Sequence, residues 1–237
     1  MLRLYKPEGI TINDFVENYK KTHGFKKVCF CGRLDPMARG EILLLINENC
    51  KQMDKYLKTD KTYEFEIIPG FQTQSDDFLG ILQKVNKNLY DLNIIKSCLD
   101  QIKENTQYEQ CFHSFSSKRI NGKSMIELTK SNVEFIKPKH SIKIYNLDVL
   151  DICKYDYNEW KDIMIDNVKK INKEKNFNQN TIISQWNNQD FNKDLYSLKV
   201  RIDVSSGFYV RQFVRELSDK LNFPLLTFDI HRTNISI

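Results

Sequence analysis

One stretch organises the chain: residues 28–46 read VCFCGRLDPMARGEILLLI. Two apolar runs are separated here by a loop that carries Asp35. Pro36 biases Asp35 toward extended backbone, because the proline ring disfavours helical angles in the preceding residue. Gly32 and Gly40 permit backbone angles that a side chain would block. The stretch predicts a strand, a rigid loop that presents a carboxylate, and a second strand, although Asp-Pro between glycines is also ordinary turn chemistry.

Composition bounds the class of protein. The chain has 237 residues, of which 41% are hydrophobic, enough for a real core in one large domain or two small ones. No run approaches the roughly 20 apolar residues of a membrane span, and the N-terminus lacks an apolar signal segment, so we expect a soluble, intracellular protein. The net charge of +5 permits nucleic-acid binding without requiring it. The spacing of the six cysteines predicts reduced thiols, with no zinc site or disulfide scaffold.

Hydrophobic periodicity locates the secondary structure. Helical spacing of apolar residues occurs over 12–19, 48–58, 91–104 and 210–221, with a further helix from about Met125, and alternation predicts strands over 61–67, 142–152, 200–204 and 228–237.

Five segments occur in an order that resembles the TruB family of RNA pseudouridine synthases. The family pattern is a K-P-x-G opening, a G-x-L-D-P-x-A-x-G loop, a K-x-Y strand, a G-x-x-T-x-x-x-D-x-x-G segment and a G-x-Y-[IV]-R turn. This chain matches it at residues 6–9, 32–40, 61–63, 70–80 and 207–211. One such motif alone is weak, whereas five in register are specific.

The resemblance implies an α+β fold of the pseudouridine-synthase kind, with a mixed, mostly antiparallel β-sheet flanked by helices and RNA-binding loops. It implies one catalytic domain over residues 1–237 without the C-terminal RNA-binding PUA domain that many relatives carry. The implied enzyme is an isomerase (an intramolecular transferase) that converts uridine to pseudouridine, at uridine 55 in the T-loop of tRNA. The reaction breaks the N1–C1′ bond, rotates the bound base and rejoins it through C5, so we expect no metal, redox cofactor or nucleotide cofactor. The expected partner is RNA, specifically the T-arm of tRNA, bound by a monomer with no membrane association.

The same resemblance assigns residues to the reaction. Asp35 is expected to act as the nucleophile, and Arg211 as the permanently charged, fork-shaped partner that keeps it ionised. Tyr63 is expected to stack on the flipped base and take part in proton transfer, with core packing as the alternative for a strand tyrosine. The expected substrate-binding residues are Phe30, Gly32, Arg33, Lys118, Arg119, Lys123 and Arg232, of which Lys118, Arg119, Lys123 and Arg232 would form a basic surface for RNA.

Two departures from the family pattern concern the substrate. Phe30 stands where the family has a histidine that helps to organise flipped nucleotides, and Phe112-His113 stands where it has a Pro-Pro pair. The segment after Phe112 reads as an RNA-contacting flap or as a polar hairpin around Asn121-Gly122, and the resemblance favours the flap. Phe30 can stack but cannot make the hydrogen bonds of histidine. A synthase for another RNA, and an inactive RNA-binding or tRNA-folding module, therefore remain alternatives.

Residues 154–195 depart from the family, which runs more directly between the flanking strands. A stripe from Trp160 to Ile171 is typical of a helix, but residues 176–192 are rich in Asn and Gln. We interpret 154–195 as a lineage-specific, Asn/Lys-rich insertion that acts as a flexible spacer, with an RNA or partner contact as the alternative. Replacing 172–194 with a short linker is then expected to leave the domain folded.

Overall fold

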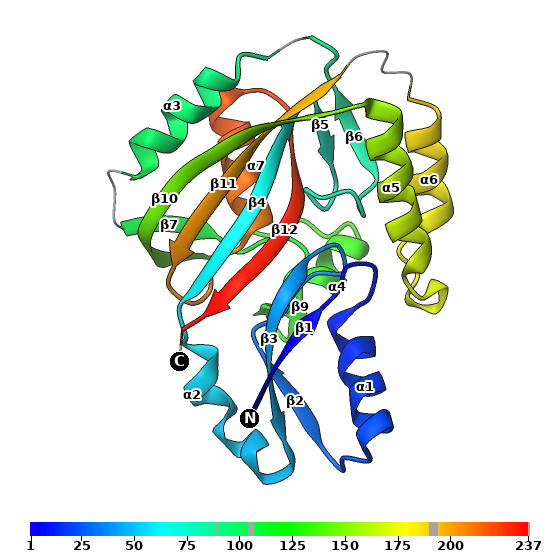
Figure 1. The fold of residues 1–237 in the computed structure, drawn as a ribbon, viewed down its shortest axis with the longest axis vertical. Helices are drawn as coiled ribbons and strands as arrows, with labels where there is room; N and C mark the ends of the chain where they lie inside the picture. The colour runs from blue at the N-terminus through cyan, green and yellow to red at the C-terminus, as the bar shows by residue number, and fades with distance from the viewer. Residues whose placement is uncertain (89, 104–106, 190–193, 237) are drawn as a thin grey trace.

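The main β-sheet runs through the whole molecule and connects its upper and lower parts (Figure 1). The structure is a computed structural model and describes residues 1–88, 90–103, 107–189 and 194–236. The sheet has eight strands in the order β1-β3-β12-β4-β11-β10-β7, with β2 paired to β3 beside this path. The strands are β1 (Leu2–Lys6), β2 (Val28–Cys31), β3 (Arg39–Ile46), β4 (Lys61–Pro69), β7 (Gln107–Cys111), β10 (Lys139–Tyr155), β11 (Leu195–Val204) and β12 (Leu225–Ile235). The β12–β3 pairing is parallel and the other pairings are antiparallel, which confirms the predicted α+β fold with its mostly antiparallel sheet.

Two helices cover one face of the upper half of the sheet (Figure 1). They are α3 (Leu92–Lys103) and α7 (Val210–Leu221). Ile95 of α3 and Phe213 of α7 are fully buried against the apolar residues of β4, β10 and β11. The core therefore fixes α7, whose first turn contains Arg211.

The lower half is built around β3, which is buried on both faces. Ile42 and Leu44 face helix α1 (Ile12–His23), while Leu43 and Leu45 face the cluster that contains the 3₁₀ helix η1 (Asn47–Gln52) and packs against α2 (Met53–Leu57). Burial on both faces explains why this strand reads as a continuous apolar run rather than as an alternating one.

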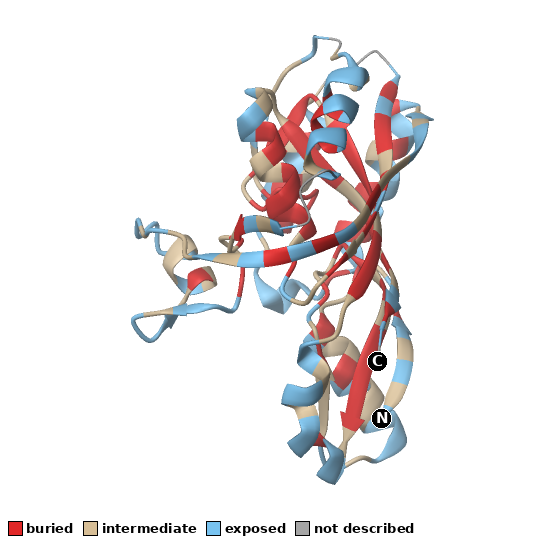
Figure 2. Cartoon of the chain, turned by 90° about the vertical axis from the view of Figure 1, so that its left-hand side faces the viewer, coloured by how far each residue is buried: buried red, intermediate tan, exposed pale blue. Residues whose placement is uncertain are grey.

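An arm projects from the body between β7 and β10 (Figure 2). It contains the hairpin of β8 (Arg119–Ile120) and β9 (Lys123–Ser124), followed by helix α4 (Met125–Lys130). Asn121 and Gly122 form the hairpin turn with positive φ angles of 49° and 84°, as the sequence predicts. Ser124 begins α4 with a capping box, its hydroxyl accepting a hydrogen bond from Glu127 N at 3.2 Å.

The described part of residues 154–195 contains a helical pair, so the expectation of a flexible spacer is wrong. Its elements are α5 (Tyr157–Lys170), the 3₁₀ helix η2 (Lys173–Lys175) and α6 (Gln179–Asn187), with α5 and α6 side by side at an edge of the molecule (Figure 1). Trp160, Ile182 and Trp186 are at most 2% exposed and belong to a second hydrophobic core with residues of β4 and β5 (Phe71–Thr73). Residues 190–193 lie outside the described part of the chain.

Most other predicted elements are present with different ends. β10 is longer than the expected strand 142–152, because residues 139–143 pair with β7 and the rest pairs with β11. β12 begins at Leu225, three residues before the expected strand, and β1 was not predicted. Positions 104 and 237 of the predicted elements lie outside the described residues. A short hairpin of β5 and β6 (Leu82–Val85) completes the fold.

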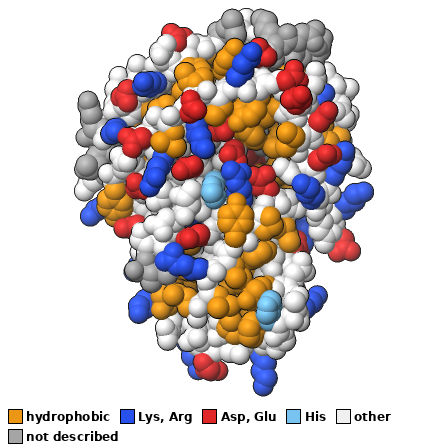
Figure 3. All heavy atoms as spheres, viewed as in Figure 1, with side chains coloured by type: hydrophobic (Ala, Val, Ile, Leu, Met, Phe, Trp, Pro, Cys, Tyr) orange, Lys and Arg blue, Asp and Glu red, His pale blue; other side chains and the backbone are white. Residues whose placement is uncertain are grey.

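The surface mixes apolar and charged side chains. On the face drawn in Figure 3, side chains of both charges gather at the middle, between apolar side chains above and below. Exposed apolar side chains of the sheet strands include Tyr5, Tyr145 and Ile152. Within the described residues, no helix is both long and apolar enough to cross a membrane.

Candidate active site

Asp35 lies in the loop between β2 and β3, where β3 changes its partner. Residues 43–46 of β3 pair with β2, and the start of β3 pairs with β12. Residues 32–38 leave the sheet between these two pairings, and a hydrogen bond from Ala38 N to Asp35 O at 3.1 Å closes a turn. The strand, loop and strand that the sequence predicts are all present.

Gly40 fixes the point at which this loop rejoins the sheet. Its φ is 122°, and a Cβ atom there would lie 2.2 Å from the backbone oxygen of Arg232. Only glycine permits so close an approach of β12.

Lys6 supports the loop from within the core, although lysine is rarely buried. Its side chain is fully buried, and Nζ donates to Ala38 O at 2.6 Å and Pro7 O at 2.9 Å. Burial lowers the pKa of Lys6 to about 8, against the opposing attraction of Asp35 and Glu8. Sequence reasoning missed this role, although Lys6 is the first residue of the K-P-x-G motif.

Arg232 is a structural residue, so its predicted place in a basic RNA-binding surface is wrong. Its side chain is fully buried. The guanidinium donates to the carbonyl oxygens of Glu41 at 2.8 Å, Arg33 at 3.3 Å and Gly32 at 3.2 Å. Arg232 thereby ties both ends of the Asp35 loop to β12, and Gly32 takes part through its backbone.

Asp35 and Arg211 form an ion pair, which confirms the pairing predicted from the sequence. Arg211 Nη2 donates to Asp35 Oδ1 at 2.7 Å, with side-chain exposures of 7% for Arg211 and 30% for Asp35. Burial acts to lower the pKa of Arg211, but the carboxylates of Asp35 and Asp77 outweigh it and raise that pKa. The arginine therefore stays charged beside Asp35.

The start of α7 places Arg211. Tyr209 precedes the helix, and its backbone N–H donates to Gln110 Oε1 at 2.9 Å while its carbonyl accepts from Gln110 Nε2 at 3.0 Å. This pair of bonds from β7 holds the helix end in place of a side-chain cap.

Asp77 is a second carboxylate beside Arg211 and was not predicted as a site residue. It is 3% exposed, and its Oδ2 lies 3.5 Å from Arg211 Nη1, which also donates to Ser75 O at 2.9 Å. Asp77 Oδ1 accepts from Ser75 Oγ at 2.5 Å and from Leu79 N at 3.0 Å. Burial raises the pKa of Asp77 to about 6, while Arg211 acts to lower it. Arg211 is therefore held on two sides.

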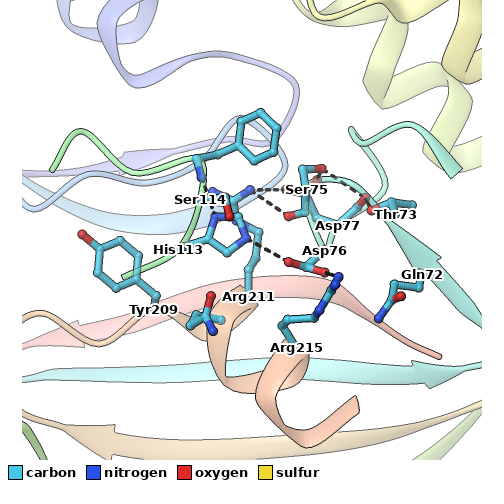
Figure 4. A network of polar contacts seen from close by, with 12 residues as sticks. Gln72, Thr73, Ser75, Asp76, Asp77, His113, Ser114, Tyr209, Arg211 and Arg215 are labelled. Atoms are coloured by element: carbon cyan, nitrogen blue, oxygen red, sulfur yellow. Dashed lines mark hydrogen bonds and ion pairs between the residues drawn. The ribbon is translucent and has the colours of Figure 1, made fainter. Parts of the chain in front are cut away.

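Asp76 extends the network away from Asp35. Figure 4 shows Asp76 between the ring of His113 and the guanidinium of Arg215. Arg215 Nη1 donates to Asp76 Oδ1 at 2.9 Å, and His113 Nε2 lies 3.1 Å from Asp76 Oδ2. His113 Nδ1 accepts from Phe115 N at 3.1 Å, so the ring is the neutral tautomer with its proton on Nε2. Burial, followed by repulsion from Arg211, lowers the pKa of His113 to about 4.

Two tyrosines, Tyr63 and Tyr209, stand in motifs of the family pattern. Tyr63 is 6% exposed and belongs to the main hydrophobic core, with its ring centroid 6.3 Å from that of Phe208. Burial, followed by the negative charge of Asp35, raises the pKa of Tyr209. Tyr209 is the third residue of the G-x-Y-[IV]-R motif and was not predicted as a site residue.

A cleft of about 510 Å³ opens beside the Asp35–Arg211 pair. Its walls come from the Asp35 loop, the segment 74–81, the arm and the helical pair of residues 154–195. Among the predicted residues, Asp35, Arg211 and Arg33 line it. The lining side chains that sequence reasoning missed include Ser75, Asp77, Phe115, Lys130, Lys175, Asn176 and Phe177.

The other predicted substrate-binding side chains lie apart from the walls of this cleft. Phe30 is half-buried against the cluster of α1 and β3, and the guanidinium carbon of Arg33 lies 5.6 Å from the centroid of its ring. Lys118, Arg119 and Lys123 are exposed on the arm. Phe112 lies beneath the Lys118 ammonium at 4.9 Å, so the arm presents a basic, partly aromatic surface.

Chemically, the site presents one partly exposed carboxylate paired with a buried, permanently charged arginine. Such a carboxylate can act as a nucleophile or as a base toward a group that enters the cleft. The surrounding polar groups of Ser75, Asp76 and Asp77 are themselves hydrogen-bonded, so the site is rigid before any substrate binds.

Comparison with known proteins gives one consistent result. Residues 20–168 match the family model described as the TruB family pseudouridylate synthase N-terminal domain. The tRNA pseudouridine synthase B of Ureaplasma urealyticum serovar 10 is 32% identical over 218 residues, which cover 92% of this chain and 77% of that protein. The enzyme of the same name from Caldanaerobacter subterraneus is 32% identical over 225 residues, which cover 94% of this chain and 64% of that protein.

Solved structures show the same fold. The chain aligns over 99% of its length with a chain of the Cbf5-Nop10-Gar1 complex, with a TM-score of 0.59 and 14% identity, and covers 48% of that chain. A chain of an H/ACA ribonucleoprotein bound to a substrate RNA containing 2′-deoxyuridine gives a TM-score of 0.55 at 14% identity, and this protein covers 46% of it. The family match, the fold and the Asp35 loop agree: the chain belongs to the TruB family of pseudouridylate synthases.

Proposed function

We propose that this protein isomerises uridine to pseudouridine in tRNA, at uridine 55 of the T-loop. The single observation that carries the proposal is the Asp35–Arg211 ion pair, 2.7 Å long, in the wall of the cleft. Asp35 belongs to the G-x-L-D-P-x-A-x-G motif and Arg211 to the G-x-Y-[IV]-R motif. The relatives from Ureaplasma urealyticum and Caldanaerobacter subterraneus are both named tRNA pseudouridine synthase B.

The size of the cleft supports a nucleotide as the group that enters it. Its volume of about 510 Å³ lies within the range of small-molecule sites, roughly 300–1,000 Å³. A stacked uridine cannot reach Asp35, so the target nucleotide flips out of its loop into the cleft. We further propose that the protein acts as a monomer on the T-arm of tRNA.

In the proposed reaction, the ionised Asp35 promotes cleavage of the N1–C1′ bond, through a covalent adduct or through elimination. The detached uracil rotates within the site, C5 bonds to C1′, and the proton that C5 loses is balanced by the proton that N1 gains. Arg211 holds the Asp35 carboxylate in place throughout. Tyr63 is proposed to stack on the base, which requires the base to enter beside Phe208, where the tyrosine ring packs.

The test is release of tritium from C5-labelled uridine in tRNA transcripts. The wild type should release it, and Asp35→Asn should lower the rate by roughly 10³-fold or more, because loss of a nucleophile removes the chemical route. Asp100→Asn, the same change at an exposed position of α3, is the matched control and should behave as the wild type. No release from any tRNA, or near-normal release by Asp35→Asn, would overturn the proposal.

A further inference from the structure

The loop of the helical pair, residues 172–178, forms one wall of the cleft. Lys175, Asn176, Phe177 and Asn178 line it together with Asp35 and Arg211. In Figure 1 this loop lies at the lower ends of α5 and α6, beside α1. Its position agrees with the ion pair of 3.1 Å between Lys175 Nζ and Asp14 Oδ1 of α1.

This wall is held rigidly. Gln179 Nε2 donates to Ile171 O at 2.7 Å and Val168 O at 3.2 Å, which ties the start of α6 to the end of α5. Asn176 and Asn178 both adopt left-handed backbone, and Phe177 between them is half-buried against the second hydrophobic core. The loop therefore presents Phe177 in a fixed place.

The same helical pair braces the loop that carries Asp35. Asn167 Nδ2 donates to Glu8 Oε2 at 2.9 Å, and a Cβ atom on Gly9, whose φ is 76°, would lie 2.9 Å from the Cβ of Lys170. Gly9 N in turn donates to Pro36 O at 3.0 Å. Two hydrogen bonds, from Asn167 to Glu8 and from Gly9 to Pro36, thus connect α5 to the residue next to Asp35.

The wall also reaches the arm across the cleft. Lys130 Nζ of α4 lies 5.8 Å from the centroid of the Phe177 ring. Lys130, Lys175 and Arg33 are exposed cationic side chains that line the cleft from three different segments: the arm, the helical pair and the Asp35 loop. A half-buried aromatic ring beside an ammonium group, in a cleft lined by further cations, suits an RNA strand, which carries a base to stack and phosphates to neutralise.

We propose that Phe177 and Lys175, together with Lys130, bind the nucleotide next to the flipped uridine. Phe177 stacks on its base, and the two lysines contact its phosphates. The proposal rests on the proposed function, since it takes the flipped uridine of that reaction as its reference point. The loop of residues 172–178 would thus bind the RNA directly beside the point at which the target base flips out.

The test measures RNA affinity by fluorescence anisotropy and KM by tritium release for Phe177→Leu and Lys175→Gln. Leucine keeps the apolar contact with the second core but loses the stacking surface. Lys173→Gln, the same charge change in the same loop but off the lining of the cleft, is the control. We expect Phe177→Leu to raise both Kd and KM about tenfold with kcat unchanged. We expect Lys175→Gln to raise them several-fold and to reduce the salt dependence of binding, while Lys173→Gln leaves both as in the wild type.

A second arm identifies the contacted base. An RNA with an abasic site beside the target uridine should bind the wild type about tenfold more weakly, and should bind Phe177→Leu no more weakly than the intact RNA does. If the wild type forms pseudouridine and both variants keep its Kd and KM, the proposed wall is wrong and the proposed function stands. If the wild type binds tRNA without forming pseudouridine and the variants still weaken binding, the proposed function is wrong and the wall stands.

Discussion

Arg211 Nη2 lies 2.7 Å from Asp35 Oδ1, although 176 positions separate the two residues in the chain. The arginine also contacts Ser75 O and the Asp77 carboxylate through Nη1, so its two terminal nitrogens contact three acceptors. A guanidinium can satisfy these acceptors at once, whereas an ammonium is a single point charge. The geometry of Asp35 therefore depends on arginine and not merely on positive charge.

Arg211→Lys is accordingly expected to lower the turnover of tRNA about hundredfold, since small displacements of a reacting group are costly. Arg215→Lys is the matched control: it lies one turn further along α7 and pairs with Asp76 and Asp219 rather than with Asp35. It should retain most of the activity. Equal activities for the two variants would show that the guanidinium geometry at position 211 is not required.

The second prediction concerns the helical pair of residues 154–195. Replacing 172–194 with a Gly-Ser linker should abolish cooperative unfolding, because it removes Ile182 and Trp186, both fully buried. Trp186→Ala alone should lower the free energy of unfolding by about 3–5 kcal/mol, the usual cost of such a cavity. Urea denaturation gives this value, and Ser184→Ala, an exposed position of the same helix, should leave it nearly unchanged. A linker variant that still unfolds cooperatively would contradict the structure of this region.

How far the sequence predicts the fold can be seen from single residues. The alternation around Tyr63, the apolar run after Gly40 and the helical stripe after Val210 were sufficient. Burial of one face leaves a periodic pattern, and burial of both faces leaves a continuous apolar run. The helix from Trp160 was expected, whereas α6 was misread because Asn residues such as Asn180 and Asn187 occupy its exposed face. The spacing of four between Ile182 and Trp186 was the signal that could have revealed α6.

Only some of the site residues were predicted from the sequence, and the reason differs from that for the fold. Asp35 and Arg211 stand in recognisable motifs, whereas Lys6 and Arg232 are of residue types that normally lie on the surface. Their roles depend on backbone carbonyls 32 and 191 positions away in the chain, which no local pattern encodes. Lys130 and Lys175 likewise become site residues only when the arm and the helical pair meet at the cleft.

The third prediction follows from His113, whose pKa in the folded protein is lowered to about 4 by burial and by Arg211. A lowered pKa means that its contribution to stability is present above the unfolded value of about 6.5 and is lost as the pH falls toward 4. His113→Gln retains an N–H donor for Asp76 but does not titrate. Between pH 7 and pH 5 the wild type should lose about 2 kcal/mol more unfolding free energy than this variant. Parallel pH profiles from urea denaturation would show that His113 does not titrate as inferred.

The last prediction tests the substrate through Phe30, the residue that departs from the family pattern. Phe30 packs beside α1 and β3, and its ring lies 5.6 Å from the guanidinium carbon of Arg33, which lines the cleft. A minimal T-arm hairpin should be modified by the wild type, because flipping a base from a loop needs only that local structure and a basic surface. Binding should weaken as the salt concentration rises. Phe30→His keeps a flat ring against Arg33 and should preserve turnover of the hairpin, whereas Phe30→Ala removes that support and should raise KM several-fold. If the wild type ignores the hairpin at every concentration but modifies another RNA, the T-loop is not the target, and Phe30 marks a cleft adapted to a different uridine-containing loop.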